Sequence, residues 1–326
     1  MHVVSGRSRL TVDTSLVDAF EVERPRLINV AYRLTGSVAD AEDAVQESWL
    51  RLARTDAEIT NLQAWLTRVV GRICLDRLTS ASARRETYVG QWLPEPVVSP
   101  LEGPSDPLTE AIRGEDNRYA ALVVLEVLPP PQRVAFVLHD AFGVSFDEIG
   151  DVLSIEPANA RQLASRARKA LADPPPSVPD NEHNEAVGRF LAAMALGDLD
   201  AVLATLHPDA LAMGDANGTT RTAVNVIRGA DKFARFFLGL LARYGDGSLT
   251  SMEPVLINGQ LGVATTGWTG ATERESYPAR VAGFAVRDGL VCAAYDVANP
   301  EKLAGVRLPG WPARPAPTAP GTSHPS

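Results

Sequence analysis

The chain has 326 residues, more than one typical domain contains, so two or three domains are expected. Its hydrophobic content of 45% is enough for folded cores and argues against global disorder. The formal net charge of −9 argues against indiscriminate coating of nucleic acid, so any basic surface must be local.

The composition also limits the location of the chain. No stretch approaches the ~20 consecutive apolar residues that cross a bilayer, and the first 13 residues lack the apolar core of a signal peptide. Cys74 and Cys292 stand far apart in apolar surroundings, so buried free thiols are expected, with a regulatory disulfide as the alternative. These features predict a cytoplasmic protein with no membrane partner.

Residues 1–15 are expected to form a flexible N-terminus and residues 16–86 an all-α domain. A first helix carries an apolar stripe made of Leu27, Val30, Ala31 and Leu34. Gly36 is expected to end this helix, and Ser37 to cap the next one.

The second helix is acidic on one face. Polar acceptors are placed there by Asp40, Asp43, Gln46 and Glu47. From composition alone, such a run is most simply a solvated helix face. A surface for a cationic protein partner is the alternative.

The third helix is cationic and starts near Asn61. Its basic side chains are Arg68, Arg72, Arg77, Arg84 and Arg85. They predict either contacts with phosphate groups or a surface balanced by neighbouring acids. Trp65 is interpreted as a core residue because of its helical spacing with Leu66 and Val69, and stacking on a base is the alternative.

Prolines and glycines mark residues 87–114 as a linker, although Trp92 and Leu93 predict that part of it docks on a folded surface. Residues 115–173 follow as a second all-α domain. Its last part, from Phe146 to Leu171, has the pattern of a helix-turn-helix.

The second helix of that motif has a basic, exposed face. No acidic residue occurs between Glu156 and Asp173. Side chains able to contact DNA bases or phosphates are Arg161, Gln162, Ser165, Arg166, Arg168 and Lys169. The pattern predicts DNA binding, and a helix-turn-helix used only for protein contact is the alternative.

A proline-rich linker over residues 174–183 leads to a third domain at 184–307. Helical patterns up to Leu241 precede four strand-like segments, and Asn258-Gly259 and Asp288-Gly289 predict hairpin turns between them. We therefore expect an α+β domain in which a curved sheet wraps its helices. The tail, residues 308–326, is expected to be disordered.

The segment Asp40-Ala-Glu-Asp-Ala-Val-Gln-Glu47 resembles region 2 of the extracytoplasmic-function (group IV) sigma factors, and residues 115–172 resemble their region 4. The third domain resembles the cone-shaped SnoaL/NTF2-like fold. Two segments, Trp92-Leu-Pro-Glu-Pro96 and Asn299-Pro-Glu-Lys-Leu303, are similar to signatures of the sigma factors that carry a fused SnoaL-like domain.

This resemblance implies an alternative sigma factor that directs promoter recognition and initiation. The acidic helix would bind the clamp coiled coil of core RNA polymerase, region 4 would also contact the flap, and the two basic helices would bind promoter DNA. The SnoaL-like domain would regulate activity in cis. The interdomain residues would be Trp92, Leu93, Pro94, Asp215, Asn299, Pro300, Lys302 and Leu303.

The family tends to have Asp-Gly-Gly-Gly-Lys where this chain has Asp215-Ala-Asn-Gly-Thr219, so the basic residue is absent and Arg221 is a candidate substitute. Some cone-shaped relatives are enzymes, and an acid–base site could draw on His207, Asp215, Tyr277 and Asp296. No spacing demands catalysis, so we expect no enzyme activity, no cofactor and no metal. A cavity enzyme or a sensor of a small ligand, coupled to a DNA-binding module, is the alternative.

Overall fold

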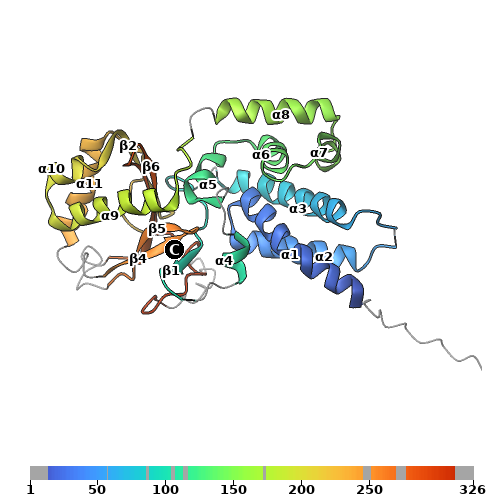
Figure 1. The fold of residues 1–326 in the computed structure, drawn as a ribbon, viewed down its shortest axis with the longest axis horizontal. Coiled ribbons are helices and arrows are strands. Elements are labelled where there is room, and N and C mark those ends of the chain that lie inside the picture. The colour runs from blue at the N-terminus through green and yellow to red at the C-terminus, as the bar shows by residue number, and fades with distance from the viewer. Residues whose placement is uncertain are drawn as a thin grey trace, which may run out of the picture. The chain divides into compact units, whose positions relative to one another are not determined.

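The computed structural model describes residues 14–56, 58–85, 88–103, 107–112, 117–171, 174–244, 251–268 and 277–312, with the backbone alone for residues 14 and 82–85 (Figure 1). Most of the predicted flexible N-terminus and disordered tail therefore lies outside the described residues. By their internal contacts, Met1–Leu78 and Pro130–Ser165 form a first compact unit, and Thr79–Pro129 and Arg166–Ser326 form a second.

The first unit is helical. Its elements are α1 (Thr14–Thr35), α2 (Val38–Leu52), α3 (Leu62–Arg85, which runs on into the second unit), α6 (Pro130–Phe136), a π-helical turn (Val137–Ala141), α7 (Phe146–Leu153) and α8 (Pro157–Ala170, which also crosses the division). The helical segment that begins at Pro130 ends as this π-helical turn.

Gly36 and Ser37 act as predicted at the boundary of α1 and α2, and α3 starts near Asn61 as predicted. Gly36 ends α1 with a left-handed backbone, φ 67°. The Ser37 side chain accepts a hydrogen bond from the amide of Asp40 at 3.2 Å, and the Asn61 side chain accepts one from Ala64 at 3.0 Å. Arg133, which is 2% exposed, adds a long-range cap because it donates to the carbonyl of Leu34.

The helix-turn-helix is formed by α7, a short turn and α8. Ser145 and Glu148 make a reciprocal capping box at the start of α7, and Ser154 takes a left-handed conformation at its end. Gly150 lets the turn close, because an added Cβ would lie 2.7 Å from the carbonyl oxygen of Ile155. The buried side of α8 is made of Ala160, Ala164 and Ala167.

The second unit combines a seven-stranded sheet with helices. Its helices are α4 (Pro107–Ile112), α5 (Tyr119–Leu125), α9 (Asp180–Leu196), α10 (Leu199–Leu203) and α11 (Ala230–Tyr244). Its strands are β1 (Val98–Pro100), β2 (Leu206–Asp215), β3 (Ile227–Arg228), β4 (Met252–Ile257), β5 (Gln260–Thr265), β6 (Arg280–Arg287) and β7 (Leu290–Val297). The predicted α+β class is confirmed.

Strand order in the sheet is β1-β4-β5-β6-β7-β2-β3, with β2 and β7 parallel and all other pairs antiparallel. Both predicted hairpins are present, and their turn residues, Asn258-Gly259 and Asp288-Gly289, have the positive φ angles that such turns require. Strand β2 was not predicted, because Pro208 and two polar neighbours interrupt its alternation.

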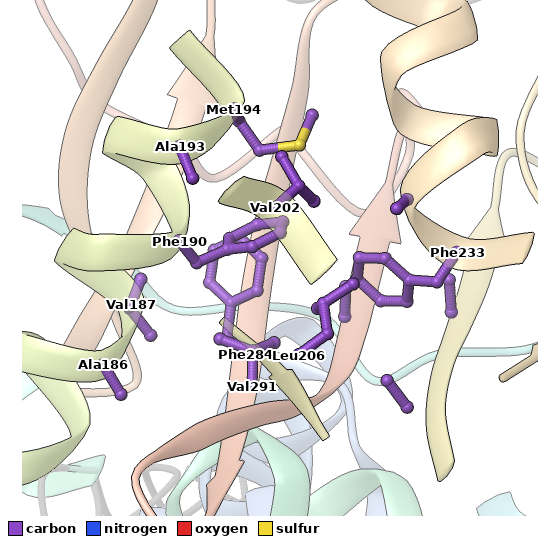
Figure 2. Packing of buried hydrophobic residues seen from close by; sticks show 14 of the residues in the cluster. Ala186, Val187, Phe190, Ala193, Met194, Val202, Leu206, Phe233, Phe284 and Val291 are labelled. Carbon is purple, nitrogen blue, oxygen red and sulfur yellow. The ribbon is translucent and has the colours of Figure 1, made fainter. Parts of the chain in front are cut away.

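The sheet is covered on both faces. Helices α9 and α11 lie over one face, where Phe190, Phe233 and Phe284 meet at the centre of the packing (Figures 1 and 2). The other face carries a second core that contains Tyr119, Val281 and Tyr295 together with Leu93 and Leu303. Successive residues of β6 alternate between the two cores, as the pleat requires.

Part of the second core comes from the segment predicted to be a linker. Strand β1 pairs antiparallel with β4, with Val98 opposite Ile257, so the linker forms an edge strand of the sheet. Helix α4 also lies within this segment. Neither element was predicted, since five prolines between residues 94 and 107 hide a strand of only three residues.

The two cysteines, Cys74 and Cys292, are free thiols. Burial raises the pKa of the Cys74 thiol well above its ordinary value. No helix in the described part of the chain is both long and apolar enough to span a bilayer.

A buried histidine makes the stability of the second unit depend on pH. His183 of α9 is 1% exposed, and its Nε2 bonds to the carbonyl oxygen of Phe284 at 3.1 Å. Burial lowers its pKa, while the nearby Asp180 and Arg118 act in opposite directions. Because the folded pKa lies below the unfolded value of about 6.5, the unfolded state binds more protons as the pH falls, and stability is lost below that value.

We therefore expect the free energy of unfolding to fall between pH 7.5 and 5.5 by at most ~1.4 kcal/mol per pH unit from this group. His183→Gln should reduce that dependence, and His207→Gln, on the half-buried start of β2, should retain it. Urea denaturation of the three proteins at the two pH values checks this. An unchanged slope in His183→Gln would contradict it.

Candidate functional site

The exposed face of α8 carries all six residues predicted there for DNA contact. Each of these side chains is exposed: Arg161, Gln162, Ser165, Arg166, Arg168 and Lys169. The guanidinium of Arg161 lies 5.1 Å from the centre of the Phe146 ring, which itself stacks on His139. This contact holds Arg161 near the start of the recognition helix, where helix-turn-helix proteins contact base edges.

The acidic face of α2 is half-buried to exposed and is partly neutralised within the first unit. Arg77 of α3 donates to Asp40 at 2.8 Å and contacts Asp43 at 3.4 Å. Glu47 pairs with Arg51 one turn further along, and Gln46 is exposed. Arg77, which was predicted to contact DNA, therefore bonds to Asp40 and Asp43, which were predicted to contact polymerase.

Two further arginines of α3 contact α7 within the first unit. Arg68 pairs with Asp151 at 3.3 Å, and Arg72 donates to the backbone carbonyl of Asp151 at 2.5 Å. Gly71, between them, lies against Val152, whose methyl carbon would be 3.2 Å from an added Cβ. Two of the five predicted promoter-contacting arginines, Arg68 and Arg72, thus bond to the first helix of the helix-turn-helix. The side chains of Arg84 and Arg85 lie outside the described residues.

A buried polar cluster joins the predicted linker to the third domain. Asp215, at the end of β2, has a fully buried side chain. Its Oδ2 accepts hydrogen bonds from the Leu93 amide at 2.8 Å and from Lys302 Nζ at 2.5 Å, and its Oδ1 accepts one from the Tyr88 hydroxyl. Burial, and next this carboxylate, raise the pKa of Tyr88, so the hydroxyl stays protonated and donates.

Lys302 completes this cluster from the other side. Its ammonium also donates to the carbonyl oxygen of Leu93 and lies 3.3 Å from the centre of a Trp92 ring. The amide of Asn299 donates to the Tyr88 hydroxyl at 2.8 Å. We call Tyr88, Leu93, Asp215, Asn299 and Lys302 the linker clamp.

The clamp contains or adjoins every residue predicted to act between domains. Trp92 is half-buried, Pro94 and Leu303 are buried, and Pro300 is exposed. The cation that faces Asp215 is Lys302, whereas the suggested substitute, Arg221, has an exposed side chain and contributes its backbone carbonyl to Arg280. The two signature segments are therefore in direct contact.

Helix α5 extends this attachment beyond the clamp. The hydroxyl of Tyr119 donates to the carbonyl of Pro94 at 2.6 Å, and its ring packs edge-on against Tyr295 of β7. Gly283 lies beneath the same ring, where an added Cβ would be 3.2 Å from a ring carbon. Asn258 bonds to Val97 and to the carbonyl of Asn117, so one turn residue contacts both the middle of the linker and the first described residue beyond it.

A cavity of about 260 Å³ lies on the opposite side of the sheet, between its strands and α9 and α11. Of the four residues considered for an acid–base site, Tyr277 and Asp296 line it. Asp215 belongs to the linker clamp, and His207 accepts a hydrogen bond from the amide of Asp209. Among the described residues, no group of three acidic, histidine or cysteine side chains could hold a metal ion.

Three family models match consecutive parts of the chain. They are Sigma-70 region 2 at residues 19–84, Sigma-70 region 4 at residues 119–171 and a SnoaL-like domain at residues 187–294. The chain is 52% identical to the ECF RNA polymerase sigma factor SigJ of Mycobacterium tuberculosis over 94% of its own length and 99% of the relative. The chain belongs to the ECF RNA polymerase sigma factors.

Other comparisons agree with this assignment. The sigma factor is 34% identical to the probable ECF sigma factor SigI of Mycobacterium tuberculosis, over 66% of the chain and 73% of that protein. The crystal structure of SigJ from Mycobacterium tuberculosis matches with a TM-score of 0.77, over 89% of this chain and 98% of that one. The predicted family and fold are confirmed.

Tyr88 of the linker clamp and two residues that hold the linker nearby, Tyr119 and Asn258, were not identified as interdomain residues from the sequence of this sigma factor. Tyr88 and Tyr119 lie outside both signature segments, and Asn258 was identified only as a turn residue. Tyr119 begins the Sigma-70 region 4 match, and no local pattern indicates that its ring packs on the SnoaL-like sheet. Nothing in the local pattern around Asn258 predicts its second set of bonds.

Removing one partner of the ion pair between Asp215 and Lys302 should strongly destabilise the folded second unit. In Lys302→Met the methionine has a similar length but no charge, so the Asp215 carboxylate stays buried without its cation. We expect the free energy of unfolding of the SnoaL-like unit to fall by ~3–5 kcal/mol. Arg235→Met removes an exposed ion pair on α11 and should cause no measurable change.

Urea denaturation of both variants and the wild type measures this difference. A Lys302→Met protein as stable as Arg235→Met would show that Asp215 does not depend on its cation.

Proposed function

We propose that this sigma factor binds core RNA polymerase through α2 and region 4 and brings it to a two-part promoter. Asp40, Asp43, Gln46 and Glu47 would accept hydrogen bonds from the clamp coiled coil, and region 4 would also contact the flap. The exposed face of α8 would bind the upstream element, and the arginines of α3 the downstream element as it melts. The protein would act in the cytoplasm, where polymerase transcribes.

Several of the residues proposed for these contacts form bonds within the first unit, and these bonds would belong to the unbound form of the protein. Arg68 and Arg72 bond to α7, and Arg77 bonds to Asp40 and Asp43, so DNA and polymerase would have to replace these internal partners. Each exchange is energetically modest, because exposed ion pairs contribute only ~0–1 kcal/mol. Polymerase binding would therefore be enough to break them.

The SnoaL-like domain would regulate the sigma factor in cis through the linker clamp. The observation that carries this proposal is Leu93, whose amide and carbonyl both bond to the clamp pair of Asp215 and Lys302. β1 lies in the sheet and Tyr119 on its face, so described parts of the connection between regions 2 and 4 are held by this domain. The domain would thus control how far apart the two regions can lie.

The cavity favours a second role for the same domain, the binding of a small ligand. Its lining is mainly apolar with a few polar groups at one end, as in ligand sites generally. We propose no catalysis. Turnover of a carbonyl compound that is abolished by Asp296→Asn would instead favour a cavity enzyme.

Promoter-directed transcription with purified core polymerase tests the main proposal. We expect transcripts with the wild type and with a truncation that ends at Asp173, at different levels. Trp92→Ala, which removes the ring beneath Lys302, should change the output by up to ~30-fold, because a desolvated cation–π contact is worth about 2 kcal/mol. Trp268→Ala, in the same unit but away from the clamp, should not.

The outcomes separate the two parts of this proposal. No transcripts and no polymerase binding from either form would contradict sigma activity. Unchanged output from a folded Trp92→Ala protein would contradict control through the linker alone.

The face of α8 can be tested with promoter fragments that the holoenzyme selects from a random library. Arg161→Ala and Gln162→Ala should each lower promoter affinity by ~5- to 150-fold if they contact bases, because a bidentate base contact is worth about 1–3 kcal/mol. Arg235→Ala removes an arginine on α11 and should leave affinity unchanged. Equal promoter affinity of all three variants would show that this face of α8 does not contact the bases.

A further inference from the structure

The apolar part of the cavity limits the size and nature of what it can hold. Its walls include Phe190, Met194, Phe237, Leu241, Met252 and Val263. Figure 2 shows Phe190 and Met194 projecting from α9 into the packed region beside the sheet. An apolar cavity of about 150 Å³ binds benzene, so 260 Å³ corresponds to a molecule of about ten non-hydrogen atoms.

One end of the cavity is polar and rigidly built. The side chains of Arg280 on β6 and Asp296 on β7 are 6% and 5% exposed, and Arg280 Nη1 donates to Asp296 Oδ2 at 3.0 Å. Thr222 donates to the same oxygen at 2.9 Å. The Arg280 guanidinium also stacks 4.4 Å from the centre of the Tyr277 ring. These bonds fix the orientation of Asp296.

Hydrogen-bonding capacity remains at this end. Both donors to Asp296 within the described residues reach Oδ2, so Oδ1 retains room for a donor. The buried Nε of Arg280 has no partner there either, and the Tyr277 hydroxyl makes no hydrogen bond with the described residues. Burial raises the pKa of Tyr277 to about 12, so its hydroxyl is a donor at neutral pH.

The charge of this polar end selects against ions. A bound anion would face the Asp296 carboxylate, and a bound cation would face the Arg280 guanidinium, in surroundings where an uncompensated charge is costly. A hydroxyl group can donate to Asp296 Oδ1 and accept from Tyr277 without adding charge. The remaining surface of the ligand must be apolar to match the walls.

We propose that the SnoaL-like cavity binds a neutral, mainly apolar alcohol or phenol whose hydroxyl group is held by Asp296 and Tyr277. This inference rests on the ligand-binding role proposed above and names the ligand class. The hydroxyl group orients the ligand at the polar end, and its carbon skeleton fills the space beneath α9 and α11.

Titration calorimetry of the full chain with naphthalene, 1-naphthol and 1-naphthoate tests the class with ligands of similar size. We expect 1-naphthol to bind ~10-fold more tightly than naphthalene, the worth of one good hydrogen bond, and 1-naphthoate to bind more weakly than 1-naphthol. Asp296→Asn and Tyr277→Phe should each lower the affinity for 1-naphthol several-fold. Tyr277→Phe keeps the aromatic ring, so it still tests the hydroxyl contact if Asp296→Asn does not fold.

A blocking variant locates the binding. Ala195 lines the cavity and is exposed, so Ala195→Trp should occlude it and abolish binding. Ala192→Trp, at an exposed position nearly one turn earlier on α9, should bind 1-naphthol as the wild type does.

The pattern of affinities distinguishes the two levels of the proposal. Equal affinity for naphthalene and 1-naphthol, or tightest binding of 1-naphthoate, would overturn the alcohol class while leaving a ligand site. No binding of any probe at about 1 mM by the folded protein, or equal binding by Ala195→Trp, would overturn the ligand site itself.

Discussion

The buried carboxylate of Asp215 is the constraint on which the second unit depends. A charge with no exposure is tolerated only when its acceptor positions are filled, and here they are filled by the backbone of Leu93, the hydroxyl of Tyr88 and the ammonium of Lys302. Two of these donors belong to the connection between the sigma regions. Without that connection, the SnoaL-like domain would keep only Lys302 of these three donors to its buried carboxylate.

Neighbouring residues of one strand, β7, contribute to the two opposite faces of the sheet. In β7, Tyr295 faces α5 while Asp296 faces the cavity, because neighbouring side chains point to opposite faces. The loop after Asp215 is held to the cavity end by Thr222, which bonds to Asp296. Asp296 at the cavity is therefore connected to Asp215 of the linker clamp by one hydrogen bond to Thr222 and the short chain segment from Asp215 to Thr222.

Much of this arrangement could be predicted from the sequence, and the exceptions have physical causes. The helix cap at Ser37, the start of α3 near Asn61, both hairpins and the exposed face of α8 follow local rules, so a single sequence predicts them. The partners of Leu93 are 122 and 209 residues away, and no local pattern encodes such distances. A surface balanced by neighbouring acids was one of two predictions for α3, but its partner α7 could not be named for the same reason.

The order of the clamp residues along the chain has a consequence for newly made molecules. The match to region 4 ends at residue 171, whereas Lys302 is added 131 residues later, ~7–26 s at typical rates of synthesis. Because domains fold as units from the N-terminus during synthesis, both sigma regions are complete before the last clamp residue exists. The age of a molecule, measured from its own translation, therefore determines whether its linker can be restrained, and restraint by a separate protein would impose no such timing.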